Sequence, residues 1–279
     1  MRQFVCNVTL ERNRNVSDST RHRHHLLLRR LQSLTGIVPI GVFLIAHLTT
    51  NSTILWGAFN SRGGDDAFSR RVGTFQEEVS WIYSMPGLLL IEIILWTSIA
   101  FHAILGMAYI HTGKSNLRQY KNADNARYTL QRISGYIGFL FIFYHIATLR
   151  WGWTFLIPGG TQWTHEFAGS TLAAALQGGT EGFTVMGIAV SLFYFVGVSM
   201  LVFHFANGLW TAAITWGLTV SVGAQRRWGQ VCAGLGVGMM LMAWASIIGF
   251  ATLDYEKAQQ VEAGTYETEP AQIHADIRN

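Results

Sequence analysis

The chain has 279 residues, of which half are hydrophobic and 13% are charged, and its formal net charge is +4 at pH 7. This composition excludes a soluble domain large enough to bury its own core and indicates a membrane protein. The two cysteines, Cys6 and Cys232, exclude a disulfide framework and a cysteine-bound zinc site.

Five apolar runs are long enough to cross a lipid bilayer, because a span needs roughly 20 mostly apolar residues. In chain order they cover residues 34–55, 85–110, 133–149, 183–209 and 228–252. The third is short, and we expect it to borrow Leu130 and Trp151 at its ends. The sequence therefore predicts an all-α membrane protein, a bundle of five transmembrane helices. It divides into an N-terminal segment (1–28), a transmembrane domain (29–252) and an acidic tail (253–279).

The basic residues predict the orientation of these spans. Residues 1–30 are basic and lack the apolar stretch of a cleaved signal, so we expect the first span to direct insertion. One side of the membrane receives residues 1–33, 111–132 and 221–227, which hold 14 of the 20 Lys and Arg residues. Because cytoplasmic segments retain such an excess, we predict a cytoplasmic N-terminus and an outward acidic tail. The positive charge then reflects topology and contact with membrane lipid, and it predicts no binding of nucleic acid.

Four histidines, His47, His102, His145 and His204, each lie in a different predicted span. An imidazole in a membrane interior needs a partner, and haem iron is a natural one. Because the spans alternate in direction, His102 and His204 fall toward the cytoplasmic side, and His47 and His145 toward the outer side. The two levels are roughly 15 Å apart along the helix axes. This pattern predicts two haems between helices one to four, and the chain lacks the Cys-x-x-Cys-His sequence of covalent attachment.

Glycines accompany the histidines at regular spacing. Gly106 and Gly208 each follow a histidine by four residues, and Gly36 and Gly135 precede one by eleven and ten. A missing side chain on the same helical face leaves room for a flat ring. Small residues also promote close packing of membrane helices, and the sequence leaves both interpretations open.

Specific motifs surround all four histidines. In the first span, residues 29–36 read Arg-Arg-Leu-Gln-Ser-Leu-Thr-Gly and precede His47-Leu-Thr-Thr-Asn; in the second, residues 101–106 hold Phe-His-Ala before Gly106. In the third, residues 130–135 read Leu-Gln-Arg-Ile-Ser-Gly and precede Tyr144-His145. In the fourth, residues 203–210 read Phe-His-Phe-Ala-Asn-Gly-Leu-Trp. In these stretches, from about Arg29 to Phe250, the chain resembles the cytochrome b (b558-type) membrane-anchor subunits of succinate:quinone oxidoreductases. This family serves succinate dehydrogenases and fumarate reductases, and the resemblance is to its two-haem, single-anchor type.

The resemblance implies a division of roles. His102 and His204 would ligate the proximal haem b, near an iron–sulfur subunit, and His47 and His145 the distal haem b. Electrons released from succinate on a separate flavoprotein subunit would pass through the iron–sulfur subunit and both haems to a membrane quinone, expected to be menaquinone. The chain would be no enzyme on its own. It would lie in the bacterial cytoplasmic membrane, within a complex whose oligomeric state the sequence leaves open.

Further positions extend this expectation. The resemblance implies that Gln32 and Ser33 contact the propionates of the proximal haem, since anions need hydrogen-bond donors. Val202 stands where some members carry a glutamate implicated in proton transfer, so that route is not expected. Glu92, the one carboxylate within a predicted span, could serve protons at a quinone site, buffer a propionate or reach interfacial water. We expect residues 171–176 to form a short surface helix over the distal site.

Two other classes of protein would fit the same histidines. The cytochrome b subunits of formate dehydrogenases and hydrogenases also use paired histidines, although they tend to place two ligands on one helix. A transporter or bare scaffold could use the histidines as a proton relay or satisfy them with backbone carbonyls. Haem absorption bands would separate the redox classes from a colourless scaffold.

Overall fold

The computed structural model describes residues 24–61, 64–112 and 123–267. Within these ranges the regular structure is entirely helical. Five helices are long and apolar enough to cross a membrane, which confirms the predicted five-helix membrane protein. These helices are His24–Phe59, Leu88–Ile110, Asn125–Leu149, Val185–Thr215 and Val222–Ala251.

The first span is interrupted once. It is helical over residues 24–37, turns at Val38, and continues as α2 (Pro39–Trp56) and the short 3-10 helix η1 (Gly57–Phe59). Proline lacks the N–H that a helix interior requires, which explains why the interruption directly precedes Pro39. The other long helices are α4 (Leu88–Thr112), α5 (Ala123–Leu149), α7 (Val185–Thr215) and α8 (Val222–Ala251).

The third span is longer than the sequence predicts. Its helix α5 begins at Ala123, seven residues before Leu130, where the span was expected to begin, and ends at Leu149, so that it includes Leu130 but not Trp151. Polar residues in its first turns find partners on α7: Arg127 Nη2 donates to Asn207 Oδ1 at 2.9 Å, and Asn207 Nδ2 donates to Gln131 Oε1 at 2.8 Å. These hydrogen bonds allow a polar segment to remain part of the bundle, which explains why the helix extends beyond Leu130 at its start.

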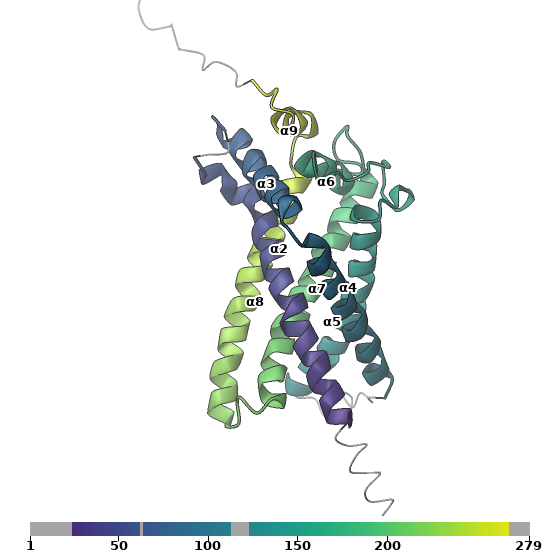
Figure 1. Cartoon of the computed structure of the whole chain (residues 1–279), viewed down its shortest axis with the longest axis vertical. Helices are drawn as coiled ribbons and strands as arrows, with labels where there is room; N and C mark the ends of the chain where they lie inside the picture. Colours follow the sequence, from purple (N-terminus) through teal and green to yellow (C-terminus); the bar gives the residue numbers. More distant parts are fainter. Residues whose placement is uncertain (1–23, 62–63, 113–122, 268–279) are drawn as a thin grey trace, which may run out of the picture.

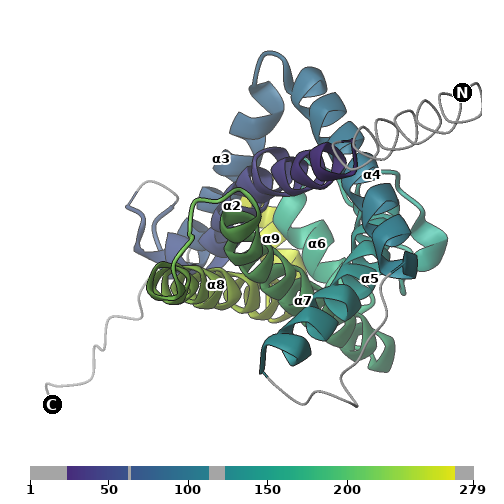
Figure 2. The same cartoon turned by 90° about the horizontal axis from the view of Figure 1, so that it is seen from below.

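The five long helices stand side by side, and short helices close one end of the bundle (Figure 1). Viewed along the bundle, α2, α4, α5 and α7 surround its centre, while α8 packs against α2 and α7 (Figure 2). The other end holds the start of the described chain, the end of α4, the start of α5 and the turn from α7 to α8. We call these the capped end and the open end. The spans therefore alternate in direction as predicted.

The cap consists of α3 (Ala67–Ser84), η2 (Thr154–Leu156), α6 (Ala168–Gln177) and α9 (Tyr255–Glu262). Apolar side chains of α3, α6, α8 and α9 form one buried cluster there, including Val72, Phe75, Leu172, Phe250 and Ala258. All ten residues of α6 are buried. The expected helix at 171–176 is therefore present, but it is an inner element rather than a surface one, because α3 and α9 pack against it. Within the predicted acidic tail, residues 255–262 form α9, and 268–279 lie outside the described residues.

The N-terminus of α6 is capped by side chains of other helices. Its own N-cap residue makes no side-chain hydrogen bond. Instead, the Ala168 N–H donates to Gln76 Oε1 at 3.1 Å, and the Gly169 N–H donates to Glu262 Oε1 at 2.6 Å. Burial raises the pKa of Glu262, and hydrogen bonds from Ser170 and Gly169 only partly oppose the increase. A single carboxylate thus ties α9 to α6.

Candidate functional site

The four histidines of the predicted spans meet in two pairs. His102 of α4 and His204 of α7 have ring centroids 6.1 Å apart, with the ring planes at 83°. His47 of α2 and His145 of α5 have centroids 5.8 Å apart, with the planes at 78°. These are the pairs expected from the alternating spans. Two imidazoles on opposite sides of one metal ion, each about 2 Å from it, would have centroids about 6 Å apart.

The two pairs lie at different levels of the bundle. His102 packs against Gly36 of the first span, and His47 lies eleven residues further along that span. Eleven residues correspond to about 16 Å of helix, which agrees with the separation estimated from the sequence. The His102–His204 pair is nearer the open end, and the His47–His145 pair nearer the cap.

Backbone carbonyls orient both rings of the pair near the open end. His102 Nδ1 lies 2.9 Å from the Gln32 carbonyl oxygen, and His204 Nδ1 lies 3.1 Å from that of Gln131. A carbonyl oxygen can only accept, so Nδ1 carries the proton of each neutral ring and Nε2 keeps its lone pair. Metal-binding histidines typically use their second nitrogen in this way.

The side chains of the same two glutamines reinforce this contact. Gln32 Nε2 donates to the His102 carbonyl at 3.4 Å, and Gln131 Nε2 donates to the His204 carbonyl at 3.1 Å. Gln32 was expected beside a haem propionate, and here it contacts a proposed ligand residue. Gln131 was not anticipated. The signal that could have identified it is a repeat, since both glutamines occur in Leu-Gln-x-Leu/Ile-Thr/Ser-Gly, at 31–36 and 130–135.

The glycines of these repeats make room for the histidine rings. A Cβ atom on Gly36 would lie 2.6 Å from His102 Cε1, and one on Gly135 would lie 3.1 Å from His204 Cε1. The structure thus favours close helix packing as their role.

The glycines that follow the histidines make room for the glutamines. A Cβ atom on Gly106 would lie 3.2 Å from Gln32 Nε2, and one on Gly208 would lie 3.6 Å from Gln131 Nε2. The two halves of the bundle therefore repeat the same arrangement of histidine, glutamine and glycine.

Aromatic rings flank the pair near the cap. Phe43 stacks on His47 with centroids 5.3 Å apart, and Phe141 stacks on His145 with centroids 5.8 Å apart. Each phenylalanine precedes its histidine by four residues, one helical turn away. The Tyr194 hydroxyl, on a residue only 7% exposed, lies 3.4 Å from His145 Nδ1.

The polar atoms near the open end are compatible with a haem. Ser33 Oγ is buried and has no hydrogen-bond partner among the described residues, so it can donate to an acidic group. Within the described ranges, no cluster of three or more His, Cys, Asp or Glu could hold a bare metal ion. Two pairs of imidazoles with centroids about 6 Å apart suit instead a metal whose remaining ligands come from a porphyrin.

Glu92 has a partner that the sequence analysis missed. Arg150, at the end of α5, donates from Nη2 to Glu92 Oε1 at 3.0 Å and to Oε2 at 3.1 Å. The pair lies toward the capped end, with side chains 26% and 51% exposed for Glu92 and Arg150. The hydrogen bond to Glu92 raises the pKa of Arg150. Because 58 positions separate the partners, only the packing of α4 beside α5 brings them together.

Comparison with known proteins identifies a relative of this chain. No family model matches the chain. Over 204 residues it is 32% identical to the succinate dehydrogenase cytochrome b558 subunit of Bacillus subtilis (strain 168). The aligned region covers 71% of this chain and 83% of that protein.

Proposed function

Because the chain belongs to the family of succinate dehydrogenase cytochrome b558 subunits, we propose that it holds two haems b and relays electrons through the membrane. His102 and His204 hold the proximal haem, and His47 and His145 hold the distal haem. Electrons from the iron–sulfur subunit of succinate dehydrogenase reach a membrane quinone, menaquinone, by this path. Oxidation of the dicarboxylate takes place on a separate flavoprotein subunit, so this chain is not an enzyme on its own.

One observation carries the proposal: at two levels, imidazoles from different helices lie with their ring centroids about 6 Å apart, which is the spacing of two imidazole ligands of one metal. When bound, haem supplies reversible one-electron chemistry, and its protein ligands set its position and environment. The carbonyls of Gln32 and Gln131 fix the tautomer of the proximal ligands and leave Nε2 for the metal.

We assign the propionates of the proximal haem to Ser33 and Gln32. Ser33 Oγ–H is buried without a partner in the described part of the chain. Gln32 Nε2 makes only a long bond to the His102 carbonyl, at 3.4 Å, so its amide can also turn toward an anion. Both residues lie in the first span, near the open end.

We place the open end in the cytoplasm, because basic residues dominate the segments at that end. The iron–sulfur subunit then docks near Arg29 and Arg132. The quinone binds toward the cap, where the Glu92–Arg150 ion pair lies between water and the level of the distal pair. Glu92 exchanges protons between water and the quinone.

Haem content per chain in the purified complex tests the proposal. We expect two haems in the natural complex and loss of the proximal haem in His204→Ala, measured by reduced-minus-oxidised absorption spectra. His165→Ala is the matched control, because His165 lies in a loop of the cap and is half-exposed. Two intact haem signals in His204→Ala would contradict the ligand assignment. Co-purification of the chain with a formate dehydrogenase or hydrogenase would favour the other redox class, and a colourless purified chain would favour a scaffold or transporter.

A further inference from the structure

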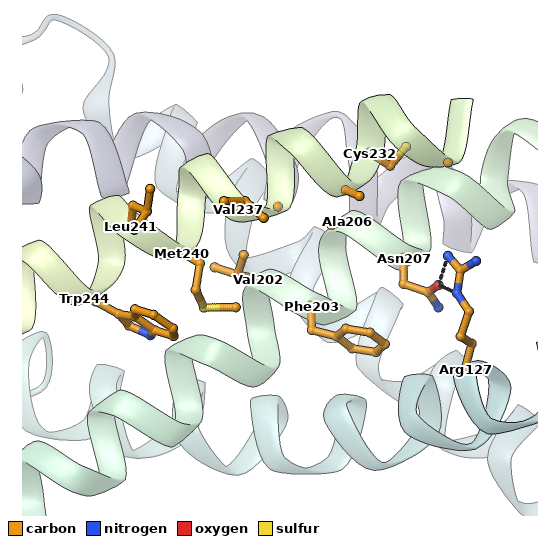
Figure 3. A pocket seen from close by; sticks show the side chains of 13 residues that line it. Arg127, Val202, Phe203, Ala206, Asn207, Cys232, Val237, Met240, Leu241 and Trp244 are labelled. Atoms are coloured by element: carbon orange, nitrogen blue, oxygen red, sulfur yellow. Dashed lines mark hydrogen bonds between the residues drawn. The ribbon is translucent and has the colours of Figure 1, made fainter. Parts of the chain in front are cut away.

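A groove of about 320 Å³ runs between α7 and α8, and the proposed function does not use it (Figure 3). Small residues make it hollow, namely Ala206 on α7 and Gly229, Ala233 and Gly236 on α8. A Cβ on Gly236 would lie 3.0 Å from the Ala206 side chain, so the two helices approach each other closely there. Apolar side chains line most of its length, and Arg127 and Asn207 lie at one end.

Arg127 is held at the head of this groove. Its Nε and Nη2 atoms donate to Asn207 Oδ1 at 3.2 and 2.9 Å, and its guanidinium carbon lies 3.9 Å from the centroid of the Trp210 ring. Asn207 is itself fixed by donating to Gln131. The guanidinium is thus oriented by neighbours rather than free to extend into water.

The charge of Arg127 has no carboxylate partner in the part of the chain that the structure describes. The ion pairs found there are Arg150–Glu92 and His165–Glu166. No carboxylate occurs on α7 or α8, and the one carboxylate of α5, Asp124, belongs to the start of the helix, whose side chains lie outside the described part. A guanidinium has five N–H donors in a planar fork, and Asn207 accepts from two of them. The remaining donors match the geometry of a phosphate.

The apolar part of the groove has the dimensions of a lipid chain. Its lining on α8 extends from Gly229 to Trp244, about 22 Å of helix. One leaflet of the hydrocarbon core is about 15 Å deep, so a tilted acyl chain can follow the groove from the interface inward. The side chains along it are mostly apolar: Val237, Met240 and Leu241 are aliphatic or thioether groups, and Phe203 and Trp244 add aromatic rings.

We propose that the α7–α8 groove binds one anionic phospholipid, with its phosphate on Arg127 and one acyl chain along α8. An unpaired, oriented cation at the head favours a full anion over the neutral carbonyls of a quinone. The basic residues Arg226 and Arg227 in the second turn of α8 add positive charge at the same end and favour an anionic over a zwitterionic lipid. This site is independent of the histidine pairs.

Native mass spectrometry of the purified complex tests the site with two added lipids of equal acyl chains, phosphatidylglycerol and phosphatidylcholine. We expect one phosphatidylglycerol retained per chain, and about tenfold weaker retention in Arg127→Gln, as for the loss of one charge-assisted hydrogen-bonding group. Lys257→Gln is the matched control for the loss of one positive charge, because Lys257 is exposed on α9 at the capped end and does not line the groove; its retention should change less than about twofold. Equal retention of the two lipids, or of phosphatidylglycerol by both variants, would overturn the proposal.

A second variant tests the apolar part without changing any charge. Ala233 lines the groove and is exposed, so Ala233→Trp should fill it without disturbing the bundle and abolish retention of phosphatidylglycerol. Unchanged retention in Ala233→Trp would contradict an acyl chain in the groove. If inorganic phosphate competes for the site as effectively as phosphatidylglycerol, the site binds only a headgroup. If menaquinone alone displaces the bound lipid, the site binds quinone. Either outcome overturns the proposal. Haem spectra recorded on the same samples report separately on the proposed electron-transfer function.

Discussion

Gln131 and His204 exchange hydrogen bonds in both directions: the Gln131 carbonyl accepts from His204 Nδ1, and the Gln131 amide donates to the His204 carbonyl, each at 3.1 Å. The same amide group accepts from Asn207 through Oε1. One side chain therefore joins the backbone of a proposed ligand to the neighbouring helix.

We predict that Gln131→Leu, which keeps the volume and the backbone carbonyl, lowers the free energy of unfolding of the complex by about 1–3 kcal/mol, because it leaves buried polar groups without partners. Haem content should remain, since Nδ1 of His204 keeps its acceptor. The measurement is thermal unfolding followed by haem absorption. Gln230→Leu is the control, because Gln230 is exposed on α8. Equal melting of the two variants would show that the amide has no structural role.

Gly36 leaves no room for a methyl group beside the His102 ring. In Gly36→Ala the new Cβ would lie 2.6 Å from His102 Cε1, and the ring would have to move. We predict loss of the proximal haem signal. Gly234→Ala is the matched control, because nothing lies within 4 Å of a Cβ there, and alanine favours a helix by about 1 kcal/mol over glycine. A normal signal of the proximal haem in Gly36→Ala would show that the His102 ring can move to accommodate the methyl group, which would contradict this prediction.

A substitution of Glu92 can distinguish a structural role of the Glu92–Arg150 ion pair from a role in proton transfer. For a pair this exposed, neutralising Glu92 should cost only about 0–1 kcal/mol of stability. If Glu92 exchanges protons at a quinone site, Glu92→Gln should lower the rate of quinone reduction by about tenfold or more while both haems stay reducible. Glu77→Gln, at an exposed position of α3, serves as control. An unchanged rate of quinone reduction in Glu92→Gln would show that Glu92 has no role in proton exchange and contributes only its ion pair with Arg150.

Glu262 makes docking of α9 dependent on pH. Burial raises its pKa above the ordinary value of 4.5, so the folded state binds a proton more tightly than the unfolded state. This contribution to stability is fully present below pH 4.5 and is lost as the pH rises through the elevated pKa. Amide hydrogen exchange at Gly169, corrected for intrinsic rates, should therefore show more protection at the lower pH. Glu262→Gln should flatten this dependence, whereas Glu256→Gln, at an exposed position of α9, should not.

The long spans and their direction follow from the sequence because both depend on local composition. Hydropathy predicts five helices, and alternation then pairs His102 with His204 and His47 with His145. The cap could not be predicted in the same way. The burial of α6 depends on Gln76 and Glu262, which lie 92 positions away on either side of Ala168 and Ser170. The partner of Glu92 was missed for the same reason, since Arg150 belongs to a different helix.

The repeated Leu-Gln-x-Leu/Ile-Thr/Ser-Gly segments have a consequence for biosynthesis. Each half of the protein contributes one imidazole to each pair, so a nascent chain halted after two crossings would possess two half-sites and no complete one. Under the proposed function, the distal site is complete once α5 has entered the bilayer, whereas the proximal site must wait for α7. Insertion of the fourth crossing would then be the earliest checkpoint at which a cell could recognise a subunit able to carry both porphyrins.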